Sequence, residues 1–204
     1  MFFIPGEFIS LLTFPGVIVH EIAHRFFCDI TGTLVYHVSY FRFGNPSGFV
    51  IHRPVTSLTK TFLISVGPLI INSVLCAVLA FPAISLYWFL DSQTYPWIFY
   101  ILGWIGISCG VHAFPSEGDL NCIEKSLEQT NKDSLLYMVV AIIVSLLTGA
   151  NALRIIWFDF IYAMFLGLII PLIIMSFMPN YDVPQLKKTT NIIFENNNFK
   201  FSKE

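Results

Sequence analysis

Charged residues are scarce in this sequence, and their scarcity excludes an ordinary water-soluble domain. Lys, Arg, Asp and Glu make up 12% of the 204 residues, whereas a soluble domain carries about a quarter. Hydrophobic residues make up 55% and fall in long runs, which is typical of a protein embedded in a lipid bilayer. The formal net charge of −2 and the lack of a basic patch with interleaved aromatic residues favour no nucleic-acid partner.

Closely spaced cysteines are also missing. The four cysteines lie far apart, in or beside apolar segments (Cys28, Cys76, Cys109 and Cys122), which indicates reduced packing residues and no disulfide framework. No basic segment precedes the first apolar run, so we expect that run to be retained and not cleaved as a signal peptide. The sequence shows neither an internal repeat nor a second folded domain. We expect one membrane-embedded domain over residues 1–179 and a polar, disordered cytoplasmic tail over 180–204.

The apolar runs predict an all-α polytopic membrane protein with about five transmembrane helices. The Pro15-Gly16 pair can kink the first helix or let another backbone approach, and the second span is long enough to tilt or to break at Pro82. Residues 120–132 are charged and predict a helical connector between the third and fourth. The expected spans are 3–27, 58–90, 95–113, 135–150 and 155–178.

A different pattern follows the first expected span. Residues 34–53 alternate between apolar and polar side chains and contain the turn-forming run Gly44-Asn45-Pro46-Ser47-Gly48. The segment is too short and too polar to cross a bilayer. It predicts a short β-hairpin directly after the first helix.

The basic residues predict the orientation in the membrane. With the N-terminus outside, ten of them fall on the cytoplasmic side and only Arg154 falls outside, a strong positive-inside bias. The cytoplasmic group comprises Arg25, Arg42, Arg53, Lys60, Lys125, Lys132, Lys187, Lys188, Lys200 and Lys203. An odd number of spans is consistent with this bias.

The run His20-Glu21-Ile22-Ala23-His24 lies within the first apolar segment. Two histidines four residues apart share one helix face and can bind one metal ion. Glu21 is placed beside them to act on a metal-bound water, taking its proton and passing it to a leaving amine. Because ionisable groups are costly in lipid, such a cluster favours a bound Zn²⁺.

A catalytic zinc needs a third protein ligand. We expect Asp119, which lies in a Pro/Gly-shaped turn after the third span, with Glu117 and His112 as alternatives. Asp119 could instead only cap the connector helix, and His112 could support the site from behind a ligand. Cys28, one helical turn after His24, could supply a thiolate. His37 and His52 lie in the hairpin and are left out of the ligand set.

A polar residue in the second span is the next candidate. Asn72 follows Gly67-Pro68, which permits close approach of a neighbouring helix. It could form a hydrogen bond between helices, or it could donate to the substrate backbone or to a developing oxyanion.

Taken together, these motifs resemble the site-2 protease family of intramembrane zinc metalloproteases. The likeness covers about residues 14–119, in the family's order. It rests on His20–His24, on residues 44–50 as the β-loop, on residues 67–72 as the Gly-Pro-x-x-x-Asn motif, and on residues 112–119 as the third-helix turn. The resemblance implies a three-helix core, zinc held by His20, His24 and Asp119, and Glu21 as general base. It also implies that the β-loop, including Gly48 and Phe49, binds an unwound membrane-protein or peptide substrate as an added strand.

The third motif departs from the family pattern. His112 stands where the family turn usually has Asn, and Asp119 follows its glycine instead of preceding one. No soluble regulatory domain is evident, so a minimal or divergent member is expected. Two other functions remain open: a zinc-binding regulatory or chaperone-like protein without turnover, and a small transporter. In the outer half of the first span, residues 8–14 offer only Ser10 and Thr13 as polar side chains, which argues against a transport path.

Overall fold

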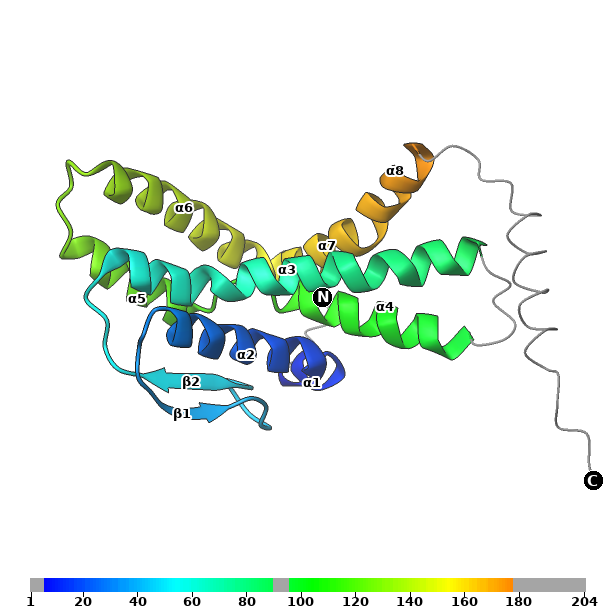
Figure 1. Cartoon of the computed structure of the whole chain (residues 1–204), viewed down its shortest axis with the longest axis horizontal. Coiled ribbons are helices and arrows are strands. Elements are labelled where there is room, and N and C mark those ends of the chain that lie inside the picture. Colours follow the sequence, from blue (N-terminus) through cyan, green and yellow to red (C-terminus); the bar gives the residue numbers. More distant parts are fainter. Residues whose placement is uncertain (1–5, 90–95, 178–204) are drawn as a thin grey trace, which may run out of the picture.

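The computed structural model describes residues 6–89 and 96–177, so the expected tail at 180–204 lies outside the described residues. The described chain is mainly helical and contains one two-stranded sheet (Figure 1). Its elements are α1 (Gly6–Leu12), α2 (Phe14–Ile30), β1 (Val35–Ser39), β2 (Phe49–His52), α3 (Leu58–Phe89), α4 (Pro96–Val111), α5 (Glu117–Glu128), α6 (Leu135–Ala152), η1 (Leu153–Ile156), α7 (Phe158–Met164), η2 (Phe165–Ile169) and α8 (Ile170–Phe177).

Two described helices are long and apolar enough to cross a membrane. They are Leu58–Phe81, with 24 residues and a mean hydropathy of 2.3, and Leu135–Ile156, with 22 residues and a mean hydropathy of 2.1. The α1–α2 pair adds a third if it counts as one broken span. The remaining apolar helices, Trp97–Val111 and Phe158–Ile174, are shorter. The described chain thus has two or three candidate spans where the hydropathy pattern predicts five.

The first expected span is interrupted. A bend of 88° separates α1 from α2, and Thr13 lies at the break. Pro15 falls in the first turn of α2, where its missing N–H costs no helical hydrogen bond. A new helix therefore starts at Phe14, one residue before the Pro15-Gly16 pair, and residues His20 to His24 lie on α2 alone.

Helices α2, α3 and α4 pack against one another (Figure 1). Gly16 of α2 lies directly against Ser108 of α4, where a Cβ on Gly16 would overlap the Ser108 carbonyl. Asn72 of α3 donates to the Gly16 carbonyl at 3.2 Å. Small residues at helix crossings let backbones approach in this way, and the three helices form the frame on which the site is built.

The predicted hairpin is confirmed. Strands β1 and β2 pair antiparallel, with Ser39 opposite Phe49 and Val38 opposite Val50. Both strands lie against α2 (Figure 1). The loop between them returns to α2 at Gly48, where a Cβ would lie 2.7 Å from Cγ of Glu21. A glycine is therefore needed here for the loop to approach the motif.

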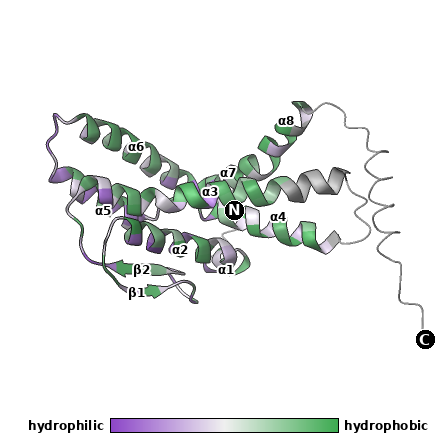
Figure 2. Ribbon diagram, viewed as in Figure 1, coloured by the Kyte–Doolittle hydropathy of each residue, from purple (hydrophilic) through white to green (hydrophobic). Residues whose placement is uncertain are grey.

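The connector helix is confirmed as α5, which packs on α3 and α6. The apolar contacts of this region come from buried residues of all three helices, including Val66, Leu120, Ile123, Val140 and Val144. Figure 2 shows hydrophilic residues gathered around α5 and the end of α2, whereas α6 and the middle of α3 are hydrophobic. One end of the molecule is therefore polar and carries the loops that follow α2 and α5.

The predicted start of the last span, at residue 155, is wrong. Instead of a helix from residue 155, the chain forms the short 3₁₀ helix η1 and then a left-handed residue, Trp157, with φ 63°. A helix resumes at Phe158 and contains the π-turn η2. The two helical arms, α6 and α7–α8, meet at this junction in a V (Figure 1). The arm α7–α8 packs on α3 and α4, whereas α6 packs on α5.

Substitution of Gly16 tests the α2–α4 crossing. Because a side chain there would collide with the Ser108 backbone, we expect Gly16→Val to cost about 1–3 kcal/mol or more. Gly149→Ala in α6 is the matched control, since a Cβ there meets nothing within 4 Å. Thermal unfolding in detergent measures both. An unchanged midpoint for Gly16→Val would contradict the crossing.

Candidate metal centre

His20 and His24 lie one helical turn apart on α2, and their Nε2 atoms are 3.1 Å from each other. The rear nitrogen of each ring is fixed by a backbone carbonyl. His20 Nδ1 lies 2.7 Å from the His112 carbonyl at the end of α4, and His24 Nδ1 lies 2.9 Å from the Ile64 carbonyl of α3. The α2–α3–α4 packing thus sets the orientation of both rings.

These contacts determine which nitrogen carries the proton. A carbonyl oxygen only accepts, so each Nδ1 must donate, and each neutral imidazole then presents Nε2 as a lone pair. Two lone pairs at 3.1 Å repel each other unless a proton or a metal cation lies between or beside them. A protein that fixes both rings in this way favours a positive charge at that point.

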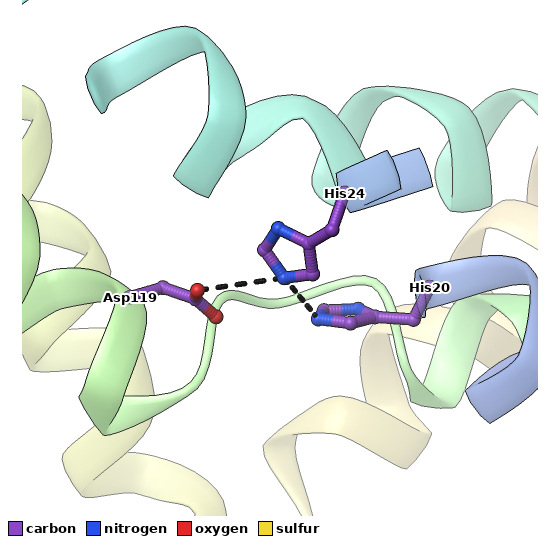
Figure 3. A group of neighbouring side chains, drawn as sticks. All are labelled: His20, His24 and Asp119. Carbon is purple, nitrogen blue, oxygen red and sulfur yellow. Dashed lines mark hydrogen bonds and ion pairs between the residues drawn. The ribbon is translucent and has the colours of Figure 1, made fainter. Parts of the chain in front are cut away.

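Asp119 completes the group from a separate helix (Figure 3). It lies in the first turn of α5, where its Oδ2 accepts from the backbone N–H of Ser116 at 2.8 Å and from the Ser116 hydroxyl at 2.6 Å. Its Oδ1 lies 3.4 Å from His24 Nε2. The capping role and the position beside the histidines, weighed above as alternatives, occur together because the two oxygens point to different partners.

The charge on Asp119 is favoured by its neighbours. Burial alone would raise the pKa of this carboxyl, but positive charge at the facing histidines, present without metal when an imidazole is protonated, and the Ser116 hydrogen bond lower it below its ordinary value. An ionised carboxylate can accept a cation directly. Asp119 therefore stands ready as an anionic ligand at neutral pH.

The three groups fit a metal ion. One ligand atom from each of His20, His24 and Asp119 lies within 4.8 Å of the others. A tetrahedral zinc with bonds of 2.0–2.1 Å would separate its ligand atoms by about 3.3 Å, close to the 3.1 Å and 3.4 Å found at His24. Two imidazoles and a carboxylate suit zinc among other metals.

The other ligand candidates do not join this group. Glu117, in the first turn of α5, is exposed and is outside the three-residue group found in the described chain. Cys28 is fully buried on α2, and its thiol is outside the three-residue group found in the described chain.

Glu21 is 6% exposed, and its Oε2 has no hydrogen-bond partner within the described chain. It lines a cavity of about 450 Å³ together with the metal candidates and with Gly48 and Phe49 of the hairpin. A buried carboxylate oxygen without a partner is costly, and this one lies in the same cavity as His20, His24 and Asp119. The residues expected as ligands, base and hairpin contacts are thus brought to one cavity.

His112 supports the site through its backbone. Its carbonyl accepts from His20 Nδ1 and, at 2.9 Å, from the Asn72 amide. Its ring donates to Thr13 Oγ1 at 2.7 Å, because the Thr13 hydroxyl itself donates to the Ile9 carbonyl. His112 is therefore positioned behind a ligand, the alternative to ligation considered above.

Asn72 takes the interhelical alternative. It is fully buried, and its amide group donates to the carbonyls of Gly16 and His112. Both donor hydrogens are used in joining α2, α3 and the end of α4. Asn72 is also not among the described residues that line the cavity, so the geometry does not favour the oxyanion donor predicted for it.

Arg154 was missed as a site residue. It lines the same cavity as Glu21 and Asp119, although the charge count put it on the opposite face of the membrane. The cavity position of Arg154 corrects the charge count. Arg154 lies in η1, directly after α6, and its Nη2 donates to the Phe114 carbonyl at 3.4 Å, in the turn before Asp119. Only a contact between distant parts of the chain reveals this position.

Removal of the third ligand tests the centre. We expect detergent-purified Asp119→Ala to lose stoichiometric zinc, because two imidazoles alone bind the ion too weakly to survive purification. Glu117→Ala, two residues away and exposed, should keep it. Metal content is measured by atomic emission; equal zinc in both variants would exclude Asp119 as a ligand.

Comparison of the chain with protein-family models, with curated proteins and with solved structures finds no match. The likeness to site-2 proteases therefore rests on the motifs alone. What the site can do has to be argued from its geometry.

Proposed function

We propose that this chain is a membrane-embedded zinc endopeptidase that hydrolyses a peptide bond in or near a membrane-spanning segment. The proposal is carried by one observation: two Nε2 lone pairs and the Asp119 carboxylate converge within 4.8 Å, with the rear nitrogens of both imidazoles bonded to carbonyls. Such a set is arranged for a divalent cation and leaves a ligand position open.

In this proposal the ion is held by Nε2 of His20, Nε2 of His24 and Oδ1 of Asp119. When bound, zinc supplies Lewis acidity, which polarises a peptide carbonyl and acidifies a water molecule. The donor set supports this assignment because each histidine is oriented by a carbonyl and the carboxylate by Ser116, as metal ligands usually are.

Glu21 acts as the general base. Its unpartnered Oε2 faces no competing donor, so it can take a proton from the attacking water and deliver it to the departing amine. Gly48 closes over the same carboxylate, which restricts bulk water around it. Because the Asn72 donors are occupied, the proposal assigns Asn72 to holding the helices and not to the oxyanion.

The substrate is a membrane protein or peptide that unwinds at the scissile bond. A helical segment hides its carbonyls in its own hydrogen bonds, and a strand edge can replace them. Strand β2 pairs only with β1 in the described sheet, and Phe49, Val50 and His52 line the cavity. The hairpin is therefore suited to receive an extended segment beside Glu21.

We further propose a multi-pass topology with the N-terminus outside and the site open towards the cytoplasm. The apolar α1–α2, α4 and α7–α8 segments would lie in the bilayer beside α3 and α6. Basic residues near this end of the chain, among them Arg25 of α2, Arg53 after β2 and Lys125 of α5, support this orientation. Figure 2 shows hydrophilic residues gathered at the same end. Arg154 no longer counts for either face, since it lines the cavity.

The variant Glu21→Gln separates chemistry from metal binding. We expect it to retain zinc and to lose cleavage of a single-span test substrate by at least about 100-fold, because a positioned general base contributes roughly that much or more. Glu124→Gln, exposed on α5, serves as the matched control. Cleavage is followed by gel mobility in detergent or in vesicles.

The outcomes distinguish the functional alternatives. Full activity of purified Glu21→Gln would remove the general-base role. A wild-type chain that holds zinc but cleaves no spanning substrate, with or without added metal, would exclude the peptidase and favour the non-proteolytic zinc protein.

A further inference from the structure

The third ligand is held differently from the first two. His20 and His24 belong to one helix, so their separation follows from helix geometry. Asp119 comes from α5, which is joined to α4 only through the turn at residues 112–116. The distance from the carboxylate to the histidine pair therefore depends on what fixes this turn.

Three carbonyls of the turn accept hydrogen bonds from other elements. The His112 carbonyl is bonded from α2 and α3, by His20 and Asn72. The carbonyls of Phe114 and Pro115 are bonded from the end of α6 and from η1: Asn151 Nδ2 donates to the Pro115 carbonyl at 3.1 Å, and Arg154 Nη2 donates to the Phe114 carbonyl at 3.4 Å. The turn is thus held from two sides.

Arg154 is itself oriented by an ion pair. Its Nε lies 2.8 Å from Oδ2 of Asp159 on α7. The left-handed residue Trp157 lets the chain turn between them, so that Asp159 comes back to face the guanidinium. Tryptophan rarely adopts this left-handed conformation. Here it places Asp159 against Arg154, which lies beside the Phe114 carbonyl.

We propose that Asn151 and Arg154 are positioning residues that set the affinity of the metal centre through Asp119. The inference rests on the metal site of the proposed function and goes beyond it, because it assigns a role to the C-terminal helices, which carry none of the recognised motifs. Groups that orient a ligand from behind change metal affinity by about 10–100-fold when they are removed.

The experiment measures zinc affinity of the detergent-purified full chain by competition with a chromogenic chelator. The variants are Asn151→Ala, Arg154→Gln and the two combined. Asn121→Ala and Arg53→Gln, both at exposed positions, are matched controls. Thermal unfolding of the metal-free proteins reports whether each variant keeps its fold. A further variant, Arg154→Lys, tests rescue, because lysine retains a cation for Asp159 and a donor for the Phe114 carbonyl.

We expect the combined variant to bind zinc about 10–100-fold more weakly, the controls to match the wild type, and Arg154→Lys to recover most of the loss. In an Asp119→Ala background the same substitutions should change affinity no further, because the effect passes through that carboxylate. Three results would overturn the inference. Zinc affinity could be unchanged in the combined variant, it could fall equally in the Asp119→Ala background, or the melting point could fall with no change in affinity. A wild-type chain that binds no zinc would instead contradict the proposed function.

Discussion

The geometry of the site depends on two hydrogen bonds that turn the Nε2 atoms of His20 and His24 towards each other. Each neutral imidazole donates its single N–H to a backbone carbonyl. Nε2 of His20 and Nε2 of His24 therefore face each other as acceptors at 3.1 Å, with Oδ1 of Asp119 3.4 Å from the latter. In a partly buried setting this arrangement is unfavourable until a cation offsets it. The packing of α2, α3 and α4 supplies the two carbonyls, and therefore the helix frame and the cation site depend on each other.

The same setting contains polar atoms that the protein itself does not satisfy. Oε2 of Glu21 and Oδ1 of Asn72 are buried without a partner among the described residues, a cost that folding alone does not explain. The proposed function accounts for this cost at Glu21, because a general base needs a carboxylate oxygen that no other group occupies. For Asn72 we have no physical account beyond the joining of three segments by its amide group.

Local patterns were readable from the sequence, and long-range contacts were not. The spacing of His20 and His24 and the turn residues of the hairpin act within a few positions, so their geometry follows directly. Asp119 was found because its turn follows an apolar run. Arg154 was misplaced because a charge count sees only the ends of hydrophobic runs, and the break at Trp157 leaves no mark in hydropathy. Length and composition likewise could not tell the five expected spans from the two or three described.

X-ray absorption at the zinc edge of the metal-loaded wild-type chain tests the central claim most directly. The account predicts two imidazole nitrogens and further oxygen ligands at about 2.0–2.2 Å, with no sulfur near 2.3 Å. A sulfur scatterer, which would point to Cys28 or Cys122, or a spectrum without paired imidazole scattering would contradict it.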